Sequence, residues 1–322
     1  MENRIYIAQK NGLAEAVKNQ PWEITMTHLE NQYITCVIAD KSLVLTGTQE
    51  GIYRSDDKGN SWESTNKGLD HTHIRWLALH DENEGLIFAG TEPAGIFVSK
   101  DNGKTWAGIP EVSRMRDEYN WMLPYSPEAG CVRGFAIHGD QAYAAVEVGG
   151  LLVSEDTGDT WHLAKGSEGR PSFASTPQGF VHADVHSIEV HPSNRKLIFA
   201  PTGGGLYRSD DGGESWDFLY NCYCRAAWID PHDPKHIILG PADGVGRNGR
   251  IEESKDGGKS WEVVSGELDA PWPHTMPERF YQLGEELFCV LDDGRLLVTD
   301  LKLLKWNFIP GINNANSICK KY

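Results

Sequence analysis

The sequence predicts an all-β fold, a single seven-bladed β-propeller, from a repeated octet, its spacing and the apolar runs between its copies. Five octets share the pattern Ser-x-Asp-x-Gly-x-Ser/Thr-Trp. They are SDDKGNSW from Ser55, SKDNGKTW from Ser99, SEDTGDTW from Ser154, SDDGGESW from Ser209 and SKDGGKSW from Ser254. Successive copies begin 44 to 55 residues apart, which is the length of one propeller blade. Repetition at this period predicts a chain of equivalent four-stranded units.

Each unit carries three apolar runs before its octet and a fourth run after the tryptophan. In one unit the runs VHSIEVHP, KLIFAP and GGLYR precede SDDGGESW, and DFLY follows it. Short runs of β-branched and aromatic residues bounded by Gly, Asp, Asn and Pro are strand signals, and no segment of comparable length shows helical periodicity. Each unit is therefore expected to be an antiparallel sheet.

Two degenerate octets raise the expected number of units to seven. TDLKLLKW, from Thr299 to Trp306, and EAVKNQPW, from Glu15 to Trp22, keep the octet length and the terminal tryptophan. The N-terminal unit lacks a first strand, so the tail ANSICKKY is expected to complete it and to remove an exposed sheet edge. The expected blades are residues 1–30 with 314–322, 33–66, 73–110, 131–166, 185–220, 223–266 and 278–311, all within one domain over residues 1–322.

Composition and charge exclude several classes of protein. The 322 residues include 30 Lys and Arg against 46 Asp and Glu, a formal charge of -16, which disfavours a nucleic-acid partner. No apolar run approaches the about 20 residues of a membrane span, and the N-terminus lacks an apolar core of signal-peptide length. The six cysteines show no paired spacing typical of a disulfide framework. We expect a cytoplasmic protein with reduced cysteines and with neither a nucleic-acid nor a membrane partner.

The octet resembles the Asp-box, or bacterial neuraminidase repeat, of a propeller superfamily that includes sialidases, xyloglucanases, sortilin-type receptors and photosystem II assembly factors. The resemblance covers nearly the whole chain and implies that each octet is a hairpin turn between the third and fourth strands, away from the axial site. The residue types agree, because Asp accepts backbone hydrogen bonds in turns, Gly adopts a positive φ and Trp packs between sheets. A structural role is expected for Asp57, Asp101, Asp156, Asp211 and Asp256. The spacing does not fit a calcium loop of the EF-hand type.

Function is expected where the first strands of the blades begin, because in a propeller these ends meet on one face. Alignment of the first strands places Thr35, Arg75, Arg133, His186, Arg225 and Arg279 at equivalent starting positions. Guanidinium groups gathered in an acidic chain indicate a substrate-binding site for a carboxylate, sulfate or phosphate, held by bidentate hydrogen bonds. The alternative is that each arginine pairs with an acid of its own blade.

Acids that could pair with these arginines lie in the loops between second and third strands. They are Glu50, Glu92, Glu147, Asp243 and Asp292 or Asp293. Either these acids neutralise the arginines, or some of them act as general acid or base beside a bound anion. Under the second hypothesis, His186 with Glu92 or Glu147 supplies proton transfer.

Two long segments, 111–130 and 166–184, precede the first strands of the fourth and fifth blades and are expected to be loops that cover the site. Tyr119, Trp121 and His182 are their candidate substrate-binding residues. Histidines gather at the same positions, and a divalent metal, if the protein uses one, would be held by His71, His73, His182 and His186. The alternative is that these histidines form hydrogen bonds within their loops.

Three functional hypotheses follow. The first is a hydrolase or lyase acting on a small anionic or carbohydrate-derived ligand, and the second is a non-catalytic scaffold with a protein partner, similar to the photosystem factors. The third is a sialidase, from which this sequence departs, because NRIYIA lacks the proline of the sialidase Arg-Ile-Pro motif and no Tyr–Glu nucleophile pair can be placed. A single propeller also lacks the cleft that two-propeller xyloglucanases form between their domains. The sequence favours the first hypothesis and leaves the substrate and any cofactor open.

Overall fold

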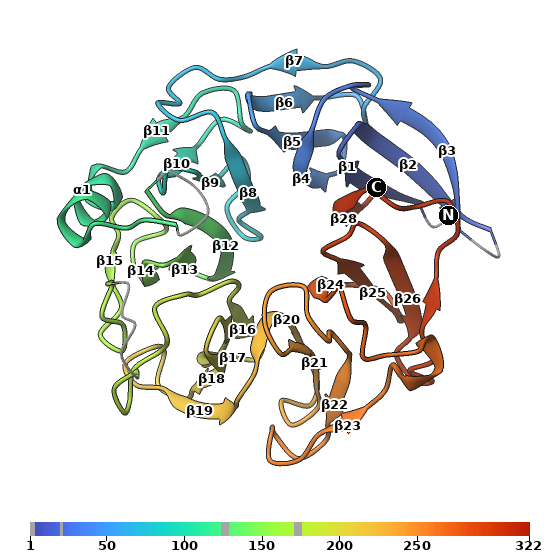
Figure 1. The fold of residues 1–322 in the computed structure, drawn as a ribbon. Coiled ribbons are helices and arrows are strands. Elements are labelled where there is room, and N and C mark those ends of the chain that lie inside the picture. Colours follow the sequence, from blue (N-terminus) through green and yellow to red (C-terminus); the bar gives the residue numbers. More distant parts are fainter. Residues whose placement is uncertain (1–3, 20–21, 124–128, 171–175) are drawn as a thin grey trace. The chain divides into compact units, whose positions relative to one another are not determined.

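The protein is all-β, with the seven four-stranded sheets of a seven-bladed propeller (Figure 1). The computed structural model describes residues 4–19, 22–123, 129–170 and 176–322. Within these ranges one α-helix, α1 (Pro110–Tyr119), and one short 3-10 turn, Gly266–Leu268, accompany the strands. The expected fold class is confirmed.

The chain forms two compact units, and the first comprises residues 1–89, 97–108 and 278–322. Four sheets lie wholly or mainly in it. They are β28 (Ala315–Lys320) with β1 (Arg4–Gln9), β2 (Gly12–Lys18) and β3 (Trp22–His28); β4 (Ile34–Asp40), β5 (Leu43–Thr48), β6 (Gly51–Ser55) and β7 (Glu63–Ser64); β8 (Ile74–Leu79), β9 (Ile87–Thr91), β10 (Ile96–Ser99) and β11 (Ala107–Gly108); and β24 (Pro277–Leu283), β25 (Glu286–Leu291), β26 (Leu296–Asp300) and β27 (Asn307–Phe308).

The second unit comprises residues 90–96 and 109–277. It contains α1 and three sheets. They are β12 (Cys131–His138), β13 (Gln141–Glu147), β14 (Gly150–Ser154) and β15 (His162–Leu163); β16 (Glu189–His191), β17 (Asn194–Thr202), β18 (Gly205–Ser209) and β19 (Asp217–Tyr220); and β20 (Tyr223–Ile229), β21 (Ile237–Ala242), β22 (Glu252–Ser254) and β23 (Glu262–Val263).

The C-terminal strand completes the N-terminal sheet, as predicted. The strand order is β28-β1-β2-β3, and β28 pairs antiparallel with β1. Ala315 and Ile318 of β28 are each 2% exposed. The backbone N–H of Val37, on β4, donates to Ser317 Oγ at 3.0 Å, so β28 also lies beside the next sheet.

Apolar cores form between adjacent sheets in both units. In the first unit, Ile5 and Trp22 pack with Phe288 and Ile318. In the second unit, a similar core gathers Tyr143, Leu151, Val185, Ile198 and Trp216. Because the middle strands of each sheet are packed on both faces, strands such as β13 are almost continuously apolar rather than alternating.

The octets are turns between the third and fourth strands of their sheets, and the side chains of each octet form hydrogen bonds within it. In all five, the first Ser Oγ accepts the glycine N–H at 2.8 Å. The Asp side chain accepts the hydroxyls of both Ser/Thr residues of the octet. The glycines have φ between 79° and 90°, a left-handed conformation that favours glycine. The structural role expected for the five aspartates agrees with these contacts.

The segment 111–130 was expected to be a loop, and this is wrong for its first part, which is helical. Pro110 occupies the first helical position, Glu111 lies in the first turn, and Asn120 ends α1 in a left-handed conformation with φ 53°. These are ordinary helix start and stop signals. The helix was not predicted because the segments on both sides of it show the pattern of strands. Residues 124–128, and residues 171–175 of the second long segment, lie outside the described residues.

All six cysteines are free in the structure. Across the described ranges, no helix is long and apolar enough to cross a bilayer.

Deletion of residues 314–322 should strongly destabilise the protein. The deletion exposes the edge of β1 and removes the buried Ile318, whose burial alone contributes roughly 1.5–3 kcal/mol. Removal of Tyr322 alone, which is 54% exposed, is the matched control and should leave the melting temperature nearly unchanged. A truncated protein that melts like the full chain would contradict the stabilising role of β28.

Asp101→Asn should destabilise the protein in a pH-dependent way. Partial burial raises the pKa of Asp101, but hydrogen bonds from Thr105, Ser99 and Lys104 outweigh it and lower the pKa to about 2. The stabilisation by the ionised carboxylate is therefore complete above the unfolded pKa of about 3.9 and is lost as the pH falls toward 2. At neutral pH the variant should lose about 1 kcal/mol of unfolding free energy. Urea titrations from neutral pH down to pH 2 measure this; a constant difference, or a rise in stability with calcium, would refute it.

Candidate functional site

Six polar side chains of the second unit form a partly buried polar cluster at the beginning of its first strands. The cluster consists of Arg133, Glu147, Asp184, His186, Tyr223 and Arg225. Arg133 lies on β12 and Arg225 on β20, each within an irregularity of the strand register, between Val132 and Gly134 and between Cys224 and Ala227. In the first unit, β4 has the same irregularity at Thr35. A bulge at this position changes the direction in which the side chain points, away from the regular alternation of the strand.

Arg133 and Glu147 form an ion pair inside the protein. Arg133 Nη1 lies 2.9 Å from Glu147 Oε2, and the two side chains are only 8% and 3% exposed. Cys131 Sγ donates to the same carboxylate oxygen at 3.2 Å. The sequence left open the alternative that each arginine pairs with an acid of its own blade, and Arg133 and Glu147 form such a pair.

His186 is completely buried, and both of its ring nitrogens have partners. Nδ1 lies 2.8 Å from the backbone oxygen of Cys224; because a carbonyl only accepts, Nδ1 carries a hydrogen. Nε2 lies 3.2 Å from Asp184 Oδ2 and 3.3 Å from the Tyr223 hydroxyl. His186 precedes β16, and its backbone N–H bonds to Pro201, so the ring is fixed by both backbone and side-chain contacts.

Burial and charge act in opposite directions on the ionisable groups of the cluster. Burial raises the pKa of Asp184, but the charge of His186 and the hydrogen bond from it outweigh this and lower the pKa below its usual value. Burial lowers the pKa of His182, which favours its neutral form. Burial raises the pKa of Tyr223 to about 12 against the opposing charge of Arg225, so the phenol remains protonated.

Arg225 is partly exposed and interacts with Tyr223. Its Nε donates to the Tyr223 hydroxyl at 3.2 Å, and its guanidinium lies 5.5 Å from the centre of the tyrosine ring. The Tyr223 ring lies 4.9 Å from that of His186. These side chains therefore form a continuous row from the buried histidine to a partly exposed arginine.

The predicted residues of the first unit have local partners of their own. Arg279 is 7% exposed, and its guanidinium lies 4.9 Å from the centre of the Trp76 ring. Arg75 lies beside Trp76 on β8 and is partly buried. His71 and His73 are in the segment before β8, where the ring of His71 meets Phe97 edge-on at 6.3 Å.

The remaining predicted residues lie in the second unit. Trp121 is fully buried, and its Nε1 donates to Gly169 at 2.6 Å, so this indole is part of the core rather than a ligand contact. Tyr119 is the last residue of α1, and the Arg170 guanidinium lies 5.3 Å from its ring centre. Glu92 is 7% exposed and lies between β9 and β10.

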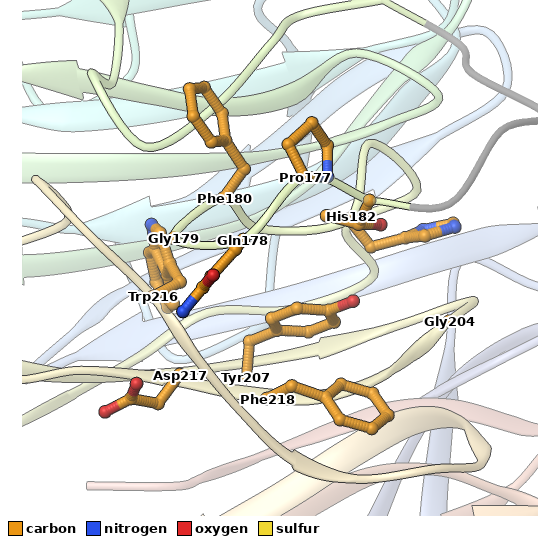
Figure 2. Close-up of a pocket in the computed structure, with 11 residues that line it drawn as sticks. Pro177, Gln178, Gly179, Phe180, His182, Gly204, Tyr207, Trp216, Asp217 and Phe218 are labelled. Carbon is orange, nitrogen blue, oxygen red and sulfur yellow. The ribbon is translucent and has the colours of Figure 1, made fainter.

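A pocket of about 580 Å³ lies beside the cluster and was not predicted from the sequence (Figure 2). Its walls are the segment 176–182 and the strands β18 and β19; Figure 2 shows Tyr207 between that segment and Phe218. The segment is held against the sheet where Trp216 N donates to Gly179 at 3.1 Å. Phe218 is 52% exposed, and its ring meets Tyr207 at 5.3 Å. His182 lines the pocket and accepts the backbone N–H of Asp184 at 3.1 Å, which connects pocket and cluster.

Asp184 and Tyr223 are the cluster members that sequence reasoning missed. Tyr223 precedes Arg225 by two residues on one strand, and residues two apart share a face, so the period of a strand could have indicated it. Asp184 lies between the two histidines of HADVH, but no pattern marked it as a partner of His186.

Comparison with known proteins supports the superfamily resemblance. The family model described as "Sortilin, neurotensin receptor 3" matches residues 50–194. An oligoxyloglucan-reducing end-specific xyloglucanase of Emericella nidulans is 23% identical in an alignment 257 positions long that covers 65% of this chain and 30% of the relative. The chain thus spans less than a third of the length of that relative.

Two solved structures have the same fold. The GH74 xyloglucanase from Xanthomonas campestris has a TM-score of 0.63 at 14% identity, over 96% of this chain and 47% of its own. YCF48 bound to D1 peptide has a TM-score of 0.59 at 16% identity, over 98% of this chain and 87% of its own. Identities this low support the fold alone.

Arg133→Ala should lower the free energy of unfolding by about 3–5 kcal/mol, because it leaves Glu147 buried without its ion-pair partner. The double variant Arg133→Met with Glu147→Gln should recover much of this loss. Arg195→Ala breaks a 3.7 Å pair between exposed side chains and should change stability by less than about 1 kcal/mol. Urea titration measures all three. If Arg133→Ala instead retains wild-type stability and weakens sulfate binding, Arg133 is an anion ligand.

Proposed function

We propose that this protein is a non-catalytic binding propeller that captures an extended segment of a partner protein in the pocket of its second unit. The observation that carries the proposal is the internal pairing of the groups considered for proton transfer. His186 is fully buried with both ring nitrogens engaged, and Glu147 is paired with Arg133. A general acid or base must reach the substrate, and these two groups are directed toward other protein groups. The scaffold hypothesis is therefore preferred over the hydrolase or lyase.

The pocket has the composition of a peptide-binding site. Phe218 places an exposed aromatic ring beside Tyr207, and Gln178 and His182 add polar groups at the margin. Aromatic side chains in such concave sites contribute much of the binding energy in protein interfaces. A volume of about 580 Å³ accommodates one or two large side chains of a partner.

The adjoining strand offers backbone groups as well. β19 is the last strand in the order β16-β17-β18-β19, so only one of its sides pairs within the sheet. An extended peptide can add to such an edge through main-chain hydrogen bonds while its alternate side chains enter the pocket. Arg225, partly exposed at the end of the cluster, is suited to an acidic group on the ligand.

The comparison with YCF48 also favours a peptide ligand. That structure contains a peptide, and its match covers most of both chains, whereas the matched xyloglucanases are much longer than this protein. Xyloglucan oligosaccharide binding is the second candidate, because the curated relatives are xyloglucanases and an exposed aromatic ring such as that of Phe218 also suits a sugar.

Peptides selected from a random phage-displayed library on the wild-type protein should lose affinity for Phe218→Ser. The expected loss is about tenfold or more, since the exposed ring is the proposed anchor of the pocket. Fluorescence anisotropy of the labelled peptides measures it. The matched control is Leu303→Ser, which removes another exposed apolar side chain, 75% exposed, in the first unit.

In the second part of this experiment, the wild-type protein is incubated with xyloglucan and its oligosaccharides, and both binding and hydrolysis are measured. Hydrolysis of xyloglucan by the wild-type protein would contradict the non-catalytic proposal. Selected peptides that bind Phe218→Ser as tightly as the wild type would contradict the pocket as the binding site.

A further inference from the structure

We propose that Glu147, Asp184 and His186 hold one divalent transition-metal ion of the zinc class. This site adjoins the proposed peptide pocket through His182, but the inference does not rest on the proposed function. The three residues each offer one ligand atom, and these atoms all lie within 4.8 Å of one another. One imidazole with two carboxylates is a donor set that suits Zn²⁺ and related ions. The site uses only His186 of the four histidines that the sequence offered as metal ligands.

The hydrogen that His186 carries on Nδ1 leaves Nε2 as the ring nitrogen that can bind a metal in place of a proton. Nδ1 donates to the backbone oxygen of Cys224 at 2.8 Å, and histidine ligands of metals commonly donate their other N–H to such a carbonyl. In the neutral ring, Nε2 then presents a lone pair toward Asp184 Oδ2, 3.2 Å away. Two lone pairs at this distance repel each other unless a proton or a cation lies between them. A proton or a cation must therefore lie between His186 Nε2 and Asp184 Oδ2.

Asp184 supplies the observation that favours a cation. Its Oδ1 is buried from solvent and has no hydrogen-bond partner among the described residues. A proton on His186 Nε2 would satisfy Oδ2 alone and would leave Oδ1 without a partner. Buried carboxylate oxygens without donors are uncommon, and a bound ion is one of their ordinary explanations.

Glu147 is held in place by its own outer contacts. Arg133 and Cys131 both bind Oε2, and ligating carboxylates are commonly fixed by such hydrogen bonds. Three protein ligands leave a fourth position of a tetrahedral ion for water or a ligand. The Asp184 side chain is 26% exposed, so the cluster is not wholly closed to solvent.

The test is titration of EDTA-treated protein with Zn²⁺ by isothermal calorimetry. The wild type should bind one equivalent, and Asp184→Asn and Glu147→Gln should each weaken it by at least about tenfold. Both substitutions keep the side-chain shape, so folding is checked by the melting temperature without metal. Asp230→Asn is the matched control, because Asp230 lies 3.2 Å from His236 in the same unit and outside the cluster.

A second measurement distinguishes zinc bound at Glu147, Asp184 and His186 from zinc bound by cysteine thiolates. Cys222→Ser should retain the zinc affinity of the wild type, and Co²⁺ bound in place of zinc should show no thiolate charge-transfer band. The proposal is overturned if the wild type binds no stoichiometric zinc. It is equally overturned if Asp184→Asn and Glu147→Gln bind zinc as tightly as the wild type.

Discussion

Five of the seven sheets depend on a turn whose side chains form hydrogen bonds to its own backbone. In each octet the serine accepts the glycine N–H and the aspartate accepts the hydroxyls. The residue before the glycine also donates its backbone N–H to a residue at or beside the connection between the first and second strands, as Gly212 does to Lys196, so the partners of the turn lie within its own sheet. The same local solution can therefore be repeated while the rest of each blade varies. This separation leaves the beginnings of the first strands free for specialised residues, and the polar cluster lies there.

The cluster satisfies most of its charges internally. Arg133 neutralises Glu147, and His186 lies between Asp184 and the backbone of β20. Such an arrangement fixes the side chains, and removing one of them lowers the free energy of unfolding, which is typical of a structural centre. The exposed features beside it, the aromatic pocket and Arg225, are then the surfaces available to a ligand. The proposal of a binding rather than a catalytic function rests on this division.

Much of the fold could be predicted because its signals are local and repeated. The octets, the apolar runs and the unpaired tail ANSICKKY gave seven sheets and the pairing of β28 with β1. The helix α1 was missed, since one short helix among many strands leaves little periodic signal. The site was predicted in part, because four of its six residues were expected at this position: Arg133, Glu147, His186 and Arg225. The register bulges that orient the two arginines, and the contact of Asp184 with His186, depend on tertiary packing and could not be predicted.

The central claim is that Arg133 and Glu147 belong to the protein's own framework and that ligands bind beside them. A crystal structure of the protein with a selected peptide tests this most directly. The account predicts peptide density along β19 with a side chain against Phe218, and an Arg133–Glu147 pair still at about 2.9 Å. Density for an anion or sugar between Arg133 and a displaced Glu147 would contradict it.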